Sequence, residues 1–221
     1  MRRVLRDNAL SLTMVGLFLV FLVAQSFAGY RSNNNDNEQH GQPPESYAEY
    51  LTSGAFVEAT FENWESEFLQ MGAYVLLTAF LIQKGSPESK NPDGDEADAD
   101  PRAERDNPDA PGPVRRGGLA LTLYEHSLSM ALFGLFLFSF VLHALGGHAE
   151  YNTQQLQHGQ AAVSLWSFVT SSEFWFQSMQ NWQSEFLGLC VMIVLSIFLR
   201  QRGSPESKPV DAPHSQTGSG E

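Results

Sequence analysis

The sequence has 221 residues, a formal net charge of −12 and a mean hydropathy of −0.21. This average hides an uneven distribution, because apolar residues gather in four runs and acidic residues gather between them. An acidic chain without a basic stripe is a poor candidate for binding nucleic acid. The single cysteine, Cys190, excludes an intrachain disulfide and any metal site built from several cysteines.

One heptapeptide occurs twice and organises the chain. Residues 63–69 read Asn-Trp-Glu-Ser-Glu-Phe-Leu and residues 181–187 read Asn-Trp-Gln-Ser-Glu-Phe-Leu, a displacement of 181 − 63 = 118 positions that we call the repeat shift. The same shift relates His-Gly-Gln at 40–42 to 158–160, Gly-Leu-Phe-Leu at 16–19 to 134–137, and Gly-Ser-Pro-Glu-Ser-Lys at 85–90 to 203–208. Blocks that share one register without a gap indicate an internal duplication.

The first apolar run of each repeat is long enough to cross a bilayer. Residues 10–28 follow three arginines and span roughly 28 Å at about 1.5 Å per residue. A cleaved secretory signal is the alternative, because residues 26–28 resemble a signal-peptidase site. The matching run at residues 128–145 lies in mid-chain, where no signal peptide can be, so we expect a retained helix.

The second span of each repeat follows the heptapeptide. We expect these spans at about residues 64–83 and 182–201, each ended by a left-handed glycine and kept from continuing by the next proline. The Gly-Ser-Pro-Glu-Ser-Lys turn is then a helix stop at the membrane surface or a docking turn for a cytoplasmic partner. Its candidate contact residues are Gly85, Ser86, Pro87, Glu88, Gly203, Ser204, Pro205 and Glu206.

Polar and aromatic segments join the spans on one side of the membrane. Residues 29–44 are expected to form an Asn-rich loop. Residues 45–62, with aromatic side chains near helical spacing, predict an amphipathic helix in the membrane interface or folded over the bundle, with Gly54 as an interruption. The second repeat is expected to contain the same outer helix.

The predicted fold is an all-α integral membrane protein with four transmembrane helices, built from two tandem parallel two-helix repeats with outer amphipathic helices. Repeat 1 covers residues 1–92 and repeat 2 covers residues 119–210. The acidic linker 93–118 and the tail 211–221 are expected to be disordered. Parallel repeats imply a pseudo-twofold axis along the membrane normal.

Basic residues set the expected orientation. Residues 29–67 contain only Arg31, and residues 146–186 contain no lysine or arginine. The flanks on the other side of the spans hold Arg2, Arg3, Arg6, Lys84, Lys90, Arg115, Arg116, Arg200, Arg202 and Lys208. The positive-inside rule therefore places both termini in the cytoplasm and the protein in the cytoplasmic membrane.

The candidate polar site consists of Asn63, Glu67, Asn181 and Glu185. The acids at 67 and 185 are kept in both copies, and about one turn inside the membrane an acid is costly unless it faces the bundle, water or a partner. A cation or proton site is one interpretation. In the other, Asn63 caps a helix, Glu67 interacts with the helix dipole, and Trp64 and Trp182 are interfacial anchors.

Other motifs offer little chemistry. His40 and His158 recur in His-Gly-Gln without a second ligand at metal spacing, so we expect no metal and no cofactor. Asp7 and Glu125 are expected to be first-turn helix acids. The sequence contains no nucleophile elbow, phosphate loop or zinc-protease motif, and we expect no enzyme.

The doubled Asn-Trp-x-Ser-Glu-Phe-Leu, with Gly-Ser-Pro-Glu-Ser-Lys after each following helix, resembles a family of prokaryotic multi-pass membrane proteins classed as a domain of unknown function. The resemblance covers roughly residues 1–92 and 119–210. It implies a membrane location and four spans, and it implies no activity.

Two functions remain open. The first is a structural or protein-interaction component of the cytoplasmic membrane, contacting the bilayer and a membrane or cytoplasmic partner protein. The second is a small cation- or proton-linked transporter or channel, which needs a homo-oligomer because four spans enclose little space. The spans contain few polar groups to line a path, and this favours the first.

Topology is directly testable. Single cysteines at Asn35, Asp98 and Thr153, on a Cys190→Ser background, are labelled on intact cells with an impermeant thiol reagent. We expect labelling at 35 and 153 and none at 98, because the linker is predicted to be cytoplasmic. Labelling at 98, or its absence at both other positions, would contradict this topology.

Overall fold

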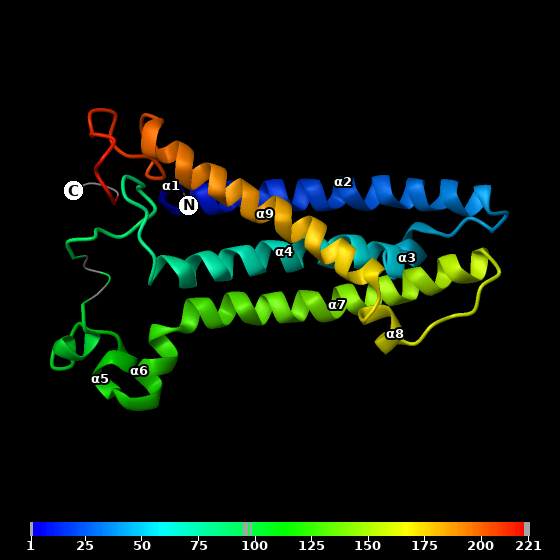
Figure 1. Ribbon diagram of the computed structural model, residues 1–221, viewed down its shortest axis with the longest axis horizontal. Helices are drawn as coiled ribbons and strands as arrows, with labels where there is room; N and C mark the ends of the chain where they lie inside the picture. The colour runs from blue at the N-terminus through cyan, green and yellow to red at the C-terminus, as the bar shows by residue number, and fades with distance from the viewer. Residues whose placement is uncertain (1, 95–96, 98, 219–221) are drawn as a thin grey trace. The chain divides into compact units, whose positions relative to one another are not determined.

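The computed structural model describes residues 2–94, 97 and 99–218, which form helices joined by turns and contain no strand. In chain order the elements are α1 (Arg2–Asp7), α2 (Ala9–Gln39), α3 (Tyr47–Tyr50), α4 (Gly54–Thr78), the 3-10 turn η2 (Pro101–Glu104), α5 (Gly112–Arg116), α6 (Gly118–Glu125), α7 (Ser127–Gln157), α8 (Leu165–Val169) and α9 (Ser172–Phe198) (Figure 1). The bounds of α2 and α7, and the starts of α3 and α8 and of α4 and α9, are related by the repeat shift.

The chain forms two compact units. Unit 1 comprises Met1–Phe61 with Val141–Trp175, and unit 2 comprises Glu62–Phe140 with Phe176–Glu221. The helices α4, α7 and α9 contribute residues to both units. The outer turns therefore belong to unit 1, and the candidate polar site with the Gly-Ser-Pro-Glu-Ser-Lys turns belongs to unit 2.

Three of the described helices are long and apolar enough to cross a membrane: α2, α7 and α9. The prediction of an all-α membrane protein agrees with this, but α4 does not reach the same apolarity. It contains four glutamates, Glu58, Glu62, Glu65 and Glu67, and it ends at Thr78, so part of the apolar segment that follows lies outside the helix.

The predicted outer loop is wrong in its first half. α2 continues to Gln39 and α7 continues to Gln157, so that the polar residues after each apolar run remain helical. Both helices end in a Schellman motif: Gly41 and Gly159 have φ of 68° and 69°, and the Gln42 and Gln160 amides donate to the Asn37 and Gln155 carbonyls at 2.8 Å. The His-Gly-Gln motif is thus a helix end.

An asparagine in each helix extension holds the returning chain. The Asn34 side chain accepts from the Glu45 amide at 2.8 Å and donates to the Glu45 carbonyl at 3.1 Å. Asn152 makes the same two bonds, at the same two distances, to Val163. The amide side chain satisfies both backbone groups of one residue, and this explains why a helix rich in asparagine forms where a loop was expected.

The predicted outer amphipathic helix is divided into two elements. A short helix, α3 or α8, precedes a break, and the long helix then starts at Gly54 or Ser172. Ser53 accepts from the Phe56 amide and Ser171 accepts from the Phe174 amide, each at 3.3 Å. These serines cap the long helices about ten residues before the expected start of each span, so α4 and α9 absorb most of the outer segment.

Each short helix places one aromatic ring against a glycine of the preceding long helix. Tyr50 covers Gly29 and Phe168 covers Gly147, and the repeat shift relates the two contacts. Both rings are buried, with exposed fractions of 3% and 1%. Tyr50 packs on Phe56 and Phe168 packs on Phe174 in T-shaped pairs with centroid separations of 5.6 and 5.5 Å. These aromatic pairs form the core of unit 1.

The helices α4 and α7 approach each other backbone to backbone in unit 1. A Cβ atom on Gly146 would lie 2.7 Å from the Glu58 amide nitrogen, and one on Gly54 would lie 2.6 Å from the Glu150 amide nitrogen. Small residues permit such close helix contacts in membrane proteins. The glycine at 54 therefore serves the crossing, and the break itself lies just before it.

Three further predictions concern the linker and the segments that precede α2 and α7. The linker, expected to be disordered, includes η2 and α5, with Val114 buried. Its disorder stays a prediction, and residues 95, 96 and 98 lie outside the described part. Asp7 and Glu125 are not first-turn acids, because they are the last residues of α1 and α6.

The glycine crossing predicts a position-specific effect within one helix. Gly146→Ala should lower stability by about 1–3 kcal/mol, because its methyl group meets backbone that cannot rotate away. Gly134→Ala, also in α7, has nothing within 4 Å of its new methyl group and should be neutral or stabilising by up to about 1 kcal/mol. Thermal unfolding in lipid nanodiscs measures both. Equal stability of the two variants would contradict the close crossing.

Candidate functional site

The polar seam between α4 and α9 is the centre of unit 2. The Trp182 indole donates from Nε1 to Glu65 Oε1 at 2.9 Å, and the Asn181 amide donates to the Glu62 carboxylate. Trp182 also packs edge-on against Phe136 of α7. Glutamates of α4 accept and side chains of α9 donate. The contacts follow the same order along both helices, because Glu62 meets Asn181 and Glu65 meets Trp182, so α4 and α9 run parallel at this seam.

Glu62 and Glu65 were not among the predicted site residues, and Glu65 is completely buried. The sequence contained a signal for these two acids, because the repeat shift relates Glu62 to Gln180 and Glu65 to Gln183. An acid in one copy and an amide in the other is the pattern expected where equivalent helices meet and two like charges would repel.

The predicted pair Glu67 and Glu185 is brought together. The two carboxyl groups lie within reach of a shared side-chain hydrogen bond, with Glu67 exposed and Glu185 half-buried. Because the repeat shift relates these residues, their meeting agrees with a pseudo-twofold arrangement of α4 and α9 at this level.

The helix-cap interpretation of this site is wrong. Asn63 and Glu67 lie in the middle of α4, which begins at Gly54, and Asn181 and Glu185 lie in the middle of α9. Helix dipoles act within the first and last turn, so neither acid gains from one. Of the two predicted anchors, Trp182 binds Glu65, and Trp64 is half-buried.

The two Gly-Ser-Pro-Glu-Ser-Lys turns share one internal structure. The Ser89 hydroxyl accepts from the Gln83 amide at 2.9 Å, and Ser86 accepts from the Glu88 amide at 3.2 Å. In the second turn Ser207 accepts from Gln201 and Ser204 accepts from Glu206 at the same distances. The identity of the two copies therefore has a local cause, since both serines of each motif hold the turn.

The glycine of the turn is left-handed, as predicted, but it does not end the helix. The φ angle is 88° at Gly85 and 83° at Gly203, whereas α4 ends at Thr78 and α9 ends at Phe198. Several non-helical residues thus separate each helix from its turn. Pro87 and Pro205 follow inside the turns and play no part in stopping the helices.

The C-terminal tail contacts both turns and covers the first. Lys208 is buried and donates from Nζ to the Gly85 carbonyl at 2.6 Å and to three carbonyls of the tail. Thr217 accepts from the Gly85 amide at 2.8 Å, and the Gly218 amide donates to the Ser86 carbonyl at 3.0 Å. The first turn is consequently covered, with Gly85 and Ser86 buried, whereas Gly203, Pro205 and Glu206 of the second turn are exposed.

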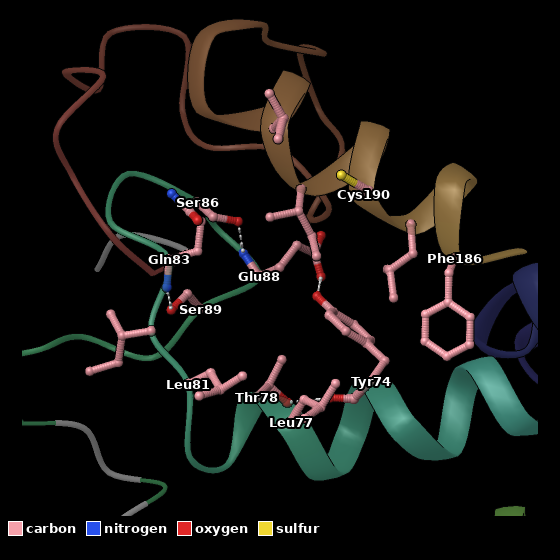
Figure 2. Close-up of a pocket in the computed structure, with 14 residues that line it drawn as sticks. Tyr74, Leu77, Thr78, Leu81, Gln83, Ser86, Glu88, Ser89, Phe186 and Cys190 are labelled. Atoms are coloured by element: carbon pink, nitrogen blue, oxygen red, sulfur yellow. Dashed lines mark hydrogen bonds between the residues drawn. The ribbon is translucent and has the colours of Figure 1, made fainter. Parts of the chain in front are cut away.

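A pocket of about 540 Å³ lies between the end of α4, the first turn and α9 (Figure 2). Its walls are mainly apolar. The lining residues include Leu77, Leu81, Ile82, Phe186, Leu189 and Ile193. Figure 2 shows Tyr74 on α4 pointing across the pocket to Glu88, whose carboxylate accepts from the tyrosine hydroxyl at 2.9 Å. Cys190, the free thiol, is exposed on the α9 wall.

Glu88 is the acidic side chain of this pocket. Burial raises its pKa, the hydrogen bond from Tyr74 acts in the opposite direction, and the neighbouring Glu206 carboxyl raises it further. Glu88 and Glu206 are related by the repeat shift, so a second pair of equivalent acids meets in unit 2. The described residues include no group of three or more metal-ligating side chains.

The profile of one protein family, a domain of unknown function (DUF6766), matches residues 1–219. The chain belongs to this family. The match includes the acidic linker, which the resemblance seen in the sequence had left out. No curated protein and no solved structure matches the DUF6766 chain.

The acid pair in the middle of the seam predicts non-additive mutations. Glu67→Gln or Glu185→Gln changes one of two carboxyl groups that face each other, so the effect of the second change depends on whether the first has been made. Unfolding of wild type, both single variants and the double variant in nanodiscs should show a coupling of about 0.5–3 kcal/mol.

The control pairs Glu67→Gln with Glu104→Gln, an exposed acid of η2. These two changes should add to within about 0.5 kcal/mol. Additivity of the Glu67 and Glu185 variants would show that the two carboxyl groups do not meet in the membrane.

Proposed function

We propose that this DUF6766 protein is a non-enzymatic structural or interaction component of the cytoplasmic membrane, with four spans and both termini in the cytoplasm. One observation carries the proposal. The polar groups of the α4–α9 seam bind each other, Glu62 to Asn181 and Glu65 to Trp182, and so hold the helices together and line no open path.

The proposal includes α4 as the fourth span. Support comes from its counterpart under the repeat shift, α9, which is apolar enough to cross a membrane. Two of the four glutamates that make α4 less apolar, Glu62 and Glu65, accept hydrogen bonds from side chains of α9 and are therefore shielded from lipid. Hydrogen-bonded acids inside a helix pair are tolerated in a bilayer where isolated ones are not.

The surfaces for lipid and partners are the apolar helices and the second turn. Every residue of α2 from Ala9 to Phe21 is exposed, and apart from Ser11 and Thr13 these residues are apolar around the whole helix. A helix that is apolar on all sides is suited to lipid or to another membrane protein. On the cytoplasmic side, Glu206 in the second turn is exposed, whereas Ser86 in the first is buried.

A second candidate function is proton- or cation-linked transport by an oligomer. The meeting of Glu67 with Glu185 favours it, because two carboxyl groups that face each other on neighbouring helices form a site that a proton or a cation can occupy. The structural role is preferred, since the remaining seam acids are satisfied by neutral donors and leave no continuous polar path along α4 and α9.

The two functions are separated by the mass of the assembly. Extraction of the tagged protein in native nanodiscs without detergent, followed by mass measurement and identification of bound proteins, should give a complex heavier than the 24.5 kDa chain with a second protein at fixed ratio. Another tagged four-span protein from the same membrane is the control. Copies of this chain alone would favour transport, and a lone monomer would contradict both functions.

A further inference from the structure

The pocket of unit 2 has the shape and lining of a small-molecule site. Its volume of about 540 Å³ falls within the range of roughly 300–1,000 Å³ that ligand sites occupy. Leucine and isoleucine side chains of α4 and α9 form its walls, and polar groups gather at the turn. Such a site binds a molecule that is largely apolar and has one polar end.

The polar end of the pocket is acidic, and in the described part of the chain no basic side chain is paired with it. Glu88 lies at the pocket with Glu206 beside it, and in the described chain neither carboxyl forms an ion pair with a basic side chain. The nearby bases bind main-chain carbonyls instead: Lys208 binds the Gly85 carbonyl, and Arg200 binds the Pro209 and Ala212 carbonyls. A bound cation favours the charged form of a nearby carboxyl group, and no base of the described chain already has that role at Glu88.

We propose that this pocket binds a lipophilic organic cation, such as an ammonium or phosphonium ion with apolar substituents. The mainly apolar walls favour an organic cation over a hydrated metal ion, which needs oxygen ligands on all sides to replace its water. The acids exclude lipophilic anions of the same shape. Tyr74 fixes the Glu88 carboxylate by its hydrogen bond, and the apolar substituents lie against Leu77, Leu189 and Ile193.

Two ions of matched shape and opposite charge test the proposal. The full-length protein in neutral phosphatidylcholine nanodiscs is dialysed against tetraphenylphosphonium or tetraphenylborate, with empty nanodiscs as the reference for partitioning. We expect saturable binding of the cation above the reference and none of the anion. Saturating cation should also slow N-ethylmaleimide labelling of Cys190 several-fold, because the thiol lines the same pocket.

Four variants test whether the cation binds in the pocket beside Glu88 and Glu206. Glu88→Gln keeps an acceptor for the Tyr74 hydroxyl and should weaken cation binding at least tenfold, and Glu206→Gln should weaken it less. Glu104→Gln, the same charge change on the exposed η2, should bind as wild type does. Ile193→Trp fills the pocket, keeps every charge, and should abolish binding.

Equal partitioning of the two ions would overturn the proposal, and so would wild-type affinity in Glu88→Gln. Phospholipid that stays bound whichever residue is at 88 would identify the pocket as a lipid contact and would overturn it as well. Thermal unfolding of each variant confirms that binding is compared among folded proteins.

Discussion

The seam between α4 and α9 is the interaction on which unit 2 depends. A glutamate buried as fully as Glu65 is costly unless it is hydrogen-bonded, and its partner is the Trp182 indole of the other repeat. A slip of one residue along either helix would leave that carboxyl without a donor. The bond therefore fixes the register of two parallel helices that apolar packing alone would hold less specifically.

The outer turns of unit 1 obey a different constraint, which is the need to satisfy backbone groups where helices end. Asn34 and Asn152 bind both backbone groups of the returning residue, and Gly41 and Gly159 close the helix ends. These residues are short and polar, and such residues alone suggest a loop. In this protein they end a long helix and allow the chain to reverse its direction within a few residues.

The two repeats are alike in local structure and unlike in surroundings. Their turns have the same internal hydrogen bonds, yet Lys208 is enclosed by carbonyls of the tail and of the first turn, whereas its counterpart Lys90 donates to the Ala79 carbonyl. Because the tail follows only the second repeat, a duplicated sequence gives a covered first turn and an open second one. The two repeats therefore share the contacts within each turn, and the docked tail makes the surroundings of the two turns different.

The sequence by itself determined the repeat, the helical class and the apolar segments, because these depend on the local order and composition of residues and not on tertiary contacts. The sequence also selected Glu67 and Glu185, since both copies keep them. The sequence could not determine that most of the outer segment belongs to α4, because a serine that caps a helix, such as Ser53, cannot be distinguished from a serine in a loop by sequence alone. Only the tertiary structure decided which acids meet which donors, and it brought Glu65 to Trp182 and Glu88 to Glu206 across more than a hundred residues, where no local pattern reaches.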